Sequence, residues 1–264
     1  MAQTDYSLEE LFDKLHLREL RTIDQNDDAW VAAGYLATSL NSFSDGLAVM
    51  DGKDPIGTIG GRIFLTHLRQ NPTHSFFKQK KAKEIMTTGL QVLQVKTCFS
   101  EIMQIWQKTK FGFSAVQKDG TLYALSLRNL LLLIPELNSK IKLSDLPKKS
   151  VVTFNKDNSI GDIIQLMFKN KVRRVMLEGT NQIVSDRTLL NDICIEMNYL
   201  KYTENVLNLS STVLNTELPE EITDDISISE LAQNLSLQVL PTVHFNENII
   251  TPWDLVNAAY GENK

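Results

Sequence analysis

The chain has 264 residues, of which 42% are hydrophobic and 22% are charged, as in an ordinary globular protein. Its formal charge of -5 argues against a protein built to hold bulk nucleic acid or an anionic membrane surface. The longest aliphatic run, Leu130 to Ile134, is far shorter than the roughly 20 residues of a membrane-spanning helix. Cys98 and Cys194 lie inside apolar segments, which predicts buried thiols in a reducing cytoplasm rather than a disulfide framework.

The first predicted element is a helix that begins at Ser7. Ser7 and Glu10 have the spacing of a capping box, and Leu8, Leu11 and Leu15 follow on one face. A helix with one apolar face packs most often on its own domain. A contact with a partner protein or a second copy in a homodimer is the alternative.

A pattern of about 60 residues then occurs four times. In each repeat a turn is followed by a short β-like run that ends in a small residue, and then by a helical segment. The small residues are 66, 59 and 66 positions apart, which predicts that repeats one and two form one pair and repeats three and four another. These residues are Gly60, Ser126, Ser185 and Thr251.

An amphipathic helix precedes each β-like hairpin. It is clearest over residues 159–168, where Ile160, Ile163, Ile164 and Met167 recur at helical spacing. Each repeat therefore reads strand, helix, strand, tight turn, strand, helix, which indicates an α/β protein.

Two polar segments link the repeats. Lys78 to Lys83 contains four lysines and is interpreted as a solvated linker, with attraction to phosphate as the alternative. Leu143 to Lys149 contains Pro147 and joins the two predicted pairs, so a domain boundary is expected there. The predicted division is an N-terminal helix over 1–16 and repeats over 17–77, 78–141, 142–200 and 201–264.

The end of the fourth repeat, Ile249 to Leu255, resembles the closing signature of a cystathionine-β-synthase (CBS) domain, in which Thr or Ser precedes Asp by three positions. The hairpin over 172–185, with Gly179 at its turn, and the segment Glu84 to Thr87 also resemble parts of a CBS domain. The resemblance covers about residues 17 to 260. It implies an α/β fold of four βαββα repeats arranged as two pseudo-symmetric pairs, called Bateman modules, similar to the γ subunit of the AMP-activated kinase.

Thr251 and Asp254 have two interpretations. Without a ligand, both residues and Pro252 suit the first turn of a helix, where a hydroxyl and a carboxylate satisfy free N–H groups. With a ligand, the same N–H groups can bind phosphate and the carboxylate can accept both ribose hydroxyls. The resemblance implies an adenine nucleotide here, AMP, ADP or ATP, with S-adenosylmethionine as a variant.

Only the fourth repeat keeps both the hydroxyl and the carboxylate. An amide in the acidic position can still accept one hydroxyl, whereas a threonine there keeps only a hydroxyl of its own. In repeat one both groups are lost, which predicts an empty site where glycine lets the backbone pack against a neighbour. The corresponding pairs are Ser126 and Asn129 in repeat two, Ser185 and Thr188 in repeat three, and Gly60 and Ile63 in repeat one.

Arginine recurs two positions after the small residue, as Arg62, Arg128 and Arg187. A charge on a helix surface is the plain interpretation. By resemblance, Arg173 and Arg174 match positions that reach phosphates in some kinase γ subunits, and such a guanidinium pair suits a polyphosphate. The predicted ligand-binding residues are Thr251, Asp254, Ser126, Asn129, Ser185, Arg187, Arg173 and Arg174.

Other chemistries have little support in the sequence. The four histidines are scattered, which disfavours a metal site, and no P-loop or nucleophile elbow is present. The sequence therefore predicts a regulatory protein that is not an enzyme, in which nucleotide bound between paired repeats changes a face read by a partner protein. The alternative is a constitutive interaction scaffold with degenerate, empty sites.

Overall fold

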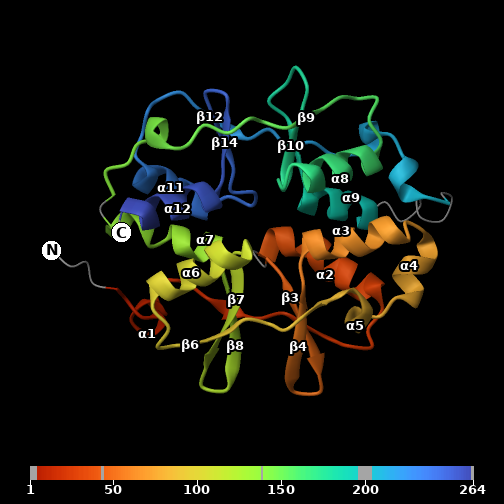
Figure 1. The fold of residues 1–264 in the computed structure, drawn as a ribbon, viewed down its shortest axis with the longest axis horizontal. Helices are drawn as coiled ribbons and strands as arrows, with labels where there is room; N and C mark the ends of the chain where they lie inside the picture. Colours follow the sequence, from red (N-terminus) through yellow and green to blue (C-terminus); the bar gives the residue numbers. More distant parts are fainter. Residues whose placement is uncertain (1–4, 43–44, 138, 196–203, 263–264) are drawn as a thin grey trace. The chain divides into compact units, whose positions relative to one another are not determined.

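The computed structural model describes residues 5–42, 45–137, 139–195 and 204–262 (Figure 1). The chain forms two compact units, each built from segments that are distant in the sequence. The first compact unit comprises residues 1–20, 91–150 and 220–264, and the second comprises residues 21–90 and 151–219.

Each compact unit therefore combines alternate repeats, two with four and one with three. The prediction that residues 150–264 form one compact half is wrong. The apolar faces of the helices form two separate hydrophobic clusters. One joins the helices of repeats one and three, and the other joins those of repeats two and four. Spacing along the chain could not reveal this, because it counts residues and not contacts. The boundary at Ser150 does lie beside the predicted linker, Leu143 to Lys149.

Every repeat has the predicted order of strands and helices. Its first strand is parallel to the second, and the second forms an antiparallel hairpin with the third. In repeat one these elements are β2 (Thr22–Asp24), α2 (Ala29–Ser42), β3 (Leu47–Asp51), β4 (Asp54–Ile59) and α3 (Gly61–Gln70), and in repeat two β6 (Val92–Gln94), α6 (Phe99–Thr109), β7 (Phe113–Lys118), β8 (Thr121–Ser126) and α7 (Leu127–Leu131).

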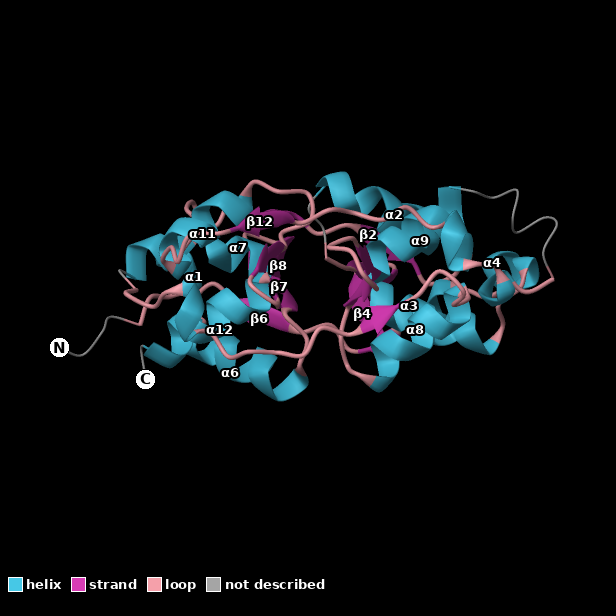
Figure 2. Ribbon diagram, turned by 90° about the horizontal axis from the view of Figure 1, so that it is seen from above, coloured by secondary structure: helices cyan, strands magenta, loops and turns pink. Residues whose placement is uncertain are grey.

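Repeats three and four follow the same plan. Within each compact unit the helices lie together on one side of the strands, between its two sheets (Figures 1 and 2). In repeat three the elements are β9 (Thr153–Phe154), α8 (Ile160–Lys169), β10 (Arg174–Leu177), β11 (Ile183–Ser185) and α9 (Asp186–Ile195), and in repeat four β12 (Glu220–Ile222), α11 (Ile228–Ser236), β13 (Val243–Phe245), β14 (Asn248–Ile250) and α12 (Pro252–Glu262).

A linking segment lies along the outer hairpin strand of every repeat. In repeats one and two it is a short fourth strand, β5 (Thr87–Thr88) on β4 and β1 (Arg18–Glu19) on β8. In repeat three Glu217 forms an antiparallel bridge with Ile183 of β11. In repeat four the backbone N–H of Lys149 donates to the Asn248 side chain at 2.9 Å. This last contact brings Lys149 to the start of β14.

The N-terminal helix packs on its own compact unit, as its apolar face predicts. Helix α1 (Leu8–Leu11) begins with the predicted capping box between Ser7 and Glu10. The backbone N–H of Leu8 donates to the Thr97 carbonyl at 2.9 Å, and the leucines of the helix are buried in the cluster of repeats two and four.

The lysine-rich linker is structured. It contains the end of α4 (His74–Gln79) and the start of α5 (Ala82–Ile85). Lys81 pairs with Asp28 at 2.6 Å, and Lys80 pairs with Glu84 at 2.9 Å. These exposed pairs favour the interpretation as a solvated linker over attraction to phosphate.

Candidate functional site

Thr251 and Asp254 meet at the start of α12. One carboxylate oxygen of Asp254, Oδ2, accepts hydrogen bonds from the Thr251 backbone N–H at 2.9 Å and from its hydroxyl at 2.7 Å. The Asp254 side chain is only 10% exposed. The carboxylate, rather than the hydroxyl, therefore acts as the cap, and the hydroxyl donates where the sequence predicted that it accepts.

The second oxygen of Asp254, Oδ1, forms an ion pair with the ammonium of Lys149. Lys149 is 56% exposed and is held in place by its backbone bond to Asn248. The sequence interpretation missed Lys149, because no spacing connects the end of the linker to a residue about 100 positions later.

Two buried polar side chains lie on the strand beside this cap. Val243 pairs with Ile250, so continuing the register by one residue sets Thr242 opposite Thr251. Thr242 is 1% exposed and His244 is 9% exposed, and residues two apart on a strand share a face. Neither Thr242 Oγ1 nor His244 Nδ1 has a hydrogen-bond partner within the described part of the chain. Such unpaired buried groups are rare in proteins and call for an explanation, for which a bound ligand is one candidate.

The equivalent position in repeat two is filled by the N-terminal segment. Asn129 Oδ1 accepts from the Ser126 backbone at 2.9 Å and from its hydroxyl at 3.1 Å, as Asp254 does in repeat four. Its Nδ2 group donates to the Leu15 carbonyl at 3.1 Å, which a carboxylate cannot do. The departure from Asp at this position thus has a structural reason.

In repeat three the two predicted residues satisfy each other. The Ser185 backbone N–H donates to the Thr188 hydroxyl at 2.8 Å, and the Thr188 backbone N–H donates to Ser185 Oγ at 3.1 Å. Both side chains are buried. This pair caps α9 and leaves no carboxylate for a ribose.

Repeat one has Gly60 at the same place, and the backbone of the next residue, Gly61, packs against a neighbour as predicted. A Cβ on Gly61 would lie 3.1 Å from Asp186 Oδ2 of repeat three. The Asp186 carboxylate therefore approaches the start of α3, where negative charge is favourable. Glycine permits this approach.

The recurring arginines contact residues of other repeats, and two of them, Arg128 and Arg187, are buried, whereas Arg62 is exposed. Arg187 pairs with Asp45 at 2.6 Å, and Arg128 donates to the carbonyls of Gln238 and Val239, the latter at 2.6 Å. Both arginines are buried, so the surface interpretation is wrong for them. The guanidinium of the third arginine, Arg62, lies 5.2 Å from the centre of the Phe168 ring. Burial and the pair with Asp45 show that Arg187 links two repeats, and its predicted role in ligand binding stays a prediction.

Arg173 and Arg174 lie at the start of β10. Arg173 Nε donates to Asp186 Oδ2 at 2.9 Å, and the nearby carboxylate raises the pKa of the Arg173 guanidinium above its ordinary value. Arg174 pairs with Ser185 across the β10–β11 hairpin. Their proposed contact with phosphate stays a prediction.

The remaining chemical predictions concern thiols, metals and membranes. Burial raises the pKa of the Cys194 thiol to about 12, as expected for an inert core cysteine, whereas Cys98 is half-buried at the start of α6. Among the described residues, no group of three or more potential ligands could hold a metal ion. No described helix is long and apolar enough to cross a membrane.

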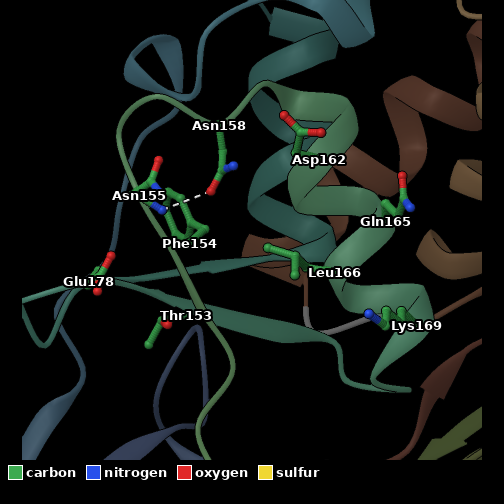
Figure 3. A pocket seen from close by; sticks show the side chains of 9 residues that line it. All are labelled: Thr153, Phe154, Asn155, Asn158, Asp162, Gln165, Leu166, Lys169 and Glu178. Carbon is green, nitrogen blue, oxygen red and sulfur yellow. Dashed lines mark hydrogen bonds between the residues drawn. The ribbon is translucent and has the colours of Figure 1, made fainter.

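A separate groove of about 430 Å³ opens in repeat three, between β9, the loop after it and α8 (Figure 3). Asn158 Oδ1 accepts from the Asn155 backbone at 2.9 Å, and Asp162 caps α8 through Ser159. None of the predicted ligand-binding residues lines it. The lining residues are Thr153, Phe154, Asn155, Asn158, Asp162, Gln165, Leu166, Lys169 and Glu178.

Comparison with solved structures identifies the fold. Protein MJ1225 of Methanocaldococcus jannaschii, named as a candidate archaeal homolog of g-AMPK, is 11% identical with a TM-score of 0.77. The match covers 94% of this chain and 99% of that one. A CBS-domain containing protein of Agrobacterium tumefaciens, ATU1752, is 18% identical over 50% of this chain and 95% of its own, with a TM-score of 0.41. The chain has a four-repeat CBS fold.

The CBS fold that the closing signature predicted is thereby confirmed, together with the α/β class. The CBS domain protein PAE2072 of Pyrobaculum aerophilum, solved in complex with AMP, is 13% identical over 47% of this chain and 90% of its own, with a TM-score of 0.38. No family model and no curated protein matches the sequence.

Proposed function

We propose that this CBS protein is a regulatory protein without enzymatic activity, which binds an adenine nucleotide at the fourth repeat. The observation that supports it most is the buried hydroxyl of Thr242, which has no partner in the described chain and neighbours the Thr251–Asp254 cap. A buried polar group without a partner costs about 1–3 kcal/mol, which a ligand with a matching group would recover. The fold shared with a candidate homolog of g-AMPK agrees with this class of ligand.

The chemistry of the site suits the ribose of AMP, ADP or ATP. Ribose carries two adjacent hydroxyls, and the carboxylate of Asp254 is the acceptor that they need. The first N–H groups of α12, beside Thr251, favour negative charge. Thr242 and His244 add a hydroxyl and an imidazole nitrogen on the neighbouring strand. S-adenosylmethionine carries the same ribose without phosphate. A comparison of its affinity with those of the nucleotides therefore separates recognition of the ribose from recognition of the phosphate.

Binding would act by a shift of populations. A ligand that prefers one arrangement of the chain stabilises it, and a partner protein that reads the same arrangement then binds more or less tightly. The partner, a homodimer and a location in the cytoplasm stay predictions.

Calorimetric titration with AMP, ADP, ATP and S-adenosylmethionine tests this function, with Asp254→Asn as the decisive variant. We expect the variant to lose about 1–3 kcal/mol of binding free energy, or about 5- to 150-fold in affinity. Asp162→Asn is the matched control, because Asp162 caps α8 through the same two bonds from Ser159, both at 2.8 Å. Equal affinity in Asp254→Asn and the wild type would refute the ribose role of Asp254.

The constitutive scaffold is the second candidate, favoured by the other three repeats. Their equivalent positions are closed by Leu15, by Thr188 and by Asp186 against Gly61. A ligand that binds only the folded state stabilises it by about 2.7 kcal/mol at a hundredfold excess over its dissociation constant. An unchanged melting temperature with every adenosine ligand would therefore favour the scaffold.

A further inference from the structure

Lys149 occupies the side of Asp254 that a ribose would need. One oxygen of the carboxylate is committed to the helix cap through Thr251, and the other is held by the Lys149 ammonium. Both oxygens therefore have partners from the chain itself. We propose that Lys149 is a built-in competitor of the nucleotide, which closes the site until the ribose displaces its ammonium. This inference rests on the proposed function.

The contacts of Lys149 make its side chain easy to displace. It is 56% exposed, so its ammonium can be hydrated as soon as it leaves Asp254. Its four-carbon stem can turn the ammonium into water, whereas Asp254, at 10% exposure, stays fixed by its cap. The backbone of Lys149 stays in place, because its N–H is bound to Asn248.

Lys149 also lies where the chain passes from one compact unit to the other, so its displacement could transmit the binding of a nucleotide. Lys149 directly precedes Ser150, the last residue of the first compact unit in this part of the chain, and Val151 begins a segment of the second. Displacement of its side chain would therefore change the charge beside the stretch of chain that leaves the first compact unit.

The first test measures adenosine binding by calorimetry in the wild type, Lys149→Met and Lys148→Met. Adenosine is the probe because it carries the ribose and no phosphate that a lysine could attract. We expect Lys149→Met to bind adenosine about three- to tenfold more tightly, because the competing cation is gone. Lys148→Met removes the same charge one residue earlier and is expected to leave the affinity unchanged. Lys149→Gln serves as a second variant, and thermal melting confirms that each protein is folded.

The second test follows the ammonium directly, by mass spectrometry after brief amine labelling. Lys149 should be labelled more slowly than Lys148 in the wild type, and faster in Asp254→Asn or with saturating adenosine. An equal labelling rate of Lys149 in the wild type and in Asp254→Asn would overturn the inference, because it would show that the ion pair is absent in solution.

The outcomes separate this inference from the function on which it rests. If the wild type binds adenosine and Lys149→Met binds it equally or more weakly, the competitor is refuted and the nucleotide function stands. If neither protein binds adenosine or any nucleotide, the nucleotide function fails, and this inference fails with it.

Discussion

Replacing Thr242 by valine should change stability and affinity in opposite directions. Valine keeps the branched shape of threonine and removes the hydroxyl. That hydroxyl is buried, at 1% exposure, and has no partner in the described chain. The variant is therefore expected to be more stable than the wild type and to bind nucleotide more weakly.

The expected changes in stability and in nucleotide affinity both follow from the loss of the Thr242 hydroxyl. Leaving a buried hydroxyl unpaired costs about 1–3 kcal/mol, and each kcal/mol shifts the melting temperature of a chain of this size by about 2–4 °C. Losing one neutral hydrogen bond to the ligand costs about 0.5–1.5 kcal/mol, or about two- to twelvefold in affinity. A residue with a purely structural role would not produce this reversal of sign.

Differential scanning calorimetry without ligand and titration with AMP measure the two effects. Thr58→Val is the matched control, since Thr58 is also a buried threonine on a strand but its hydroxyl donates to the Leu47 carbonyl at 3.0 Å. That variant should melt at a lower temperature. A drop in melting temperature for Thr242→Val as large as that for Thr58→Val would refute the reasoning, because it would show that the Thr242 hydroxyl has a partner.

Two further predictions concern the architecture and the helix caps. Residues 151–264 expressed alone should show no cooperative melting by circular dichroism, because α8 and α9 lack α2 and α3, and mixing with residues 1–150 should restore it. A cooperative transition of 151–264 alone would contradict this. Hydrogen bonds from Ser159 lower the pKa of Asp162 below its ordinary value of 3.8, so its stabilising effect is present above that pH and lost as the pH falls through the folded-state pKa. The melting temperatures of Asp162→Asn and wild type should therefore differ at pH 7 and converge as the pH falls below 3.8 and through the folded-state pKa; a constant difference would exclude this cause.

Local patterns predicted the elements of the fold well. The order of strands and helices in each repeat depends on spacing between near neighbours, such as Ile160, Ile163, Ile164 and Met167, which all lie in the core. The CBS signature at Thr251 and Asp254 likewise joins residues within one helical turn. The spacing implies their contact, although in the structure the Thr251 hydroxyl donates to the carboxylate and does not accept.

The contacts between distant segments could not be predicted in this way. Arg128 and Arg187 each stand two positions after the small residue that ends a strand, a position that suggested charges on the helix surface. Only the folded chain shows that they contact Val239 and Asp45. The association of alternate repeats has the same origin, because an apolar helix face does not specify which other face covers it. Lys149 was missed for this reason as well.

The four equivalent positions show how a repeat loses its ligand chemistry. Repeat two replaces the carboxylate by Asn129, whose extra donor binds Leu15, and repeat three closes through Thr188. In both, the closing group is a backbone carbonyl or a buried side chain. In repeat four, Asp254 is closed by a lysine side chain that is largely exposed and free to turn away. In a repeat that binds no ligand, we expect Thr242 to be paired or its hydroxyl to be absent, because an unpaired buried hydroxyl costs about 1–3 kcal/mol. A buried, unpaired Thr242 beside a displaceable lysine is therefore better explained by a ligand at this repeat than by a scaffold with four closed positions.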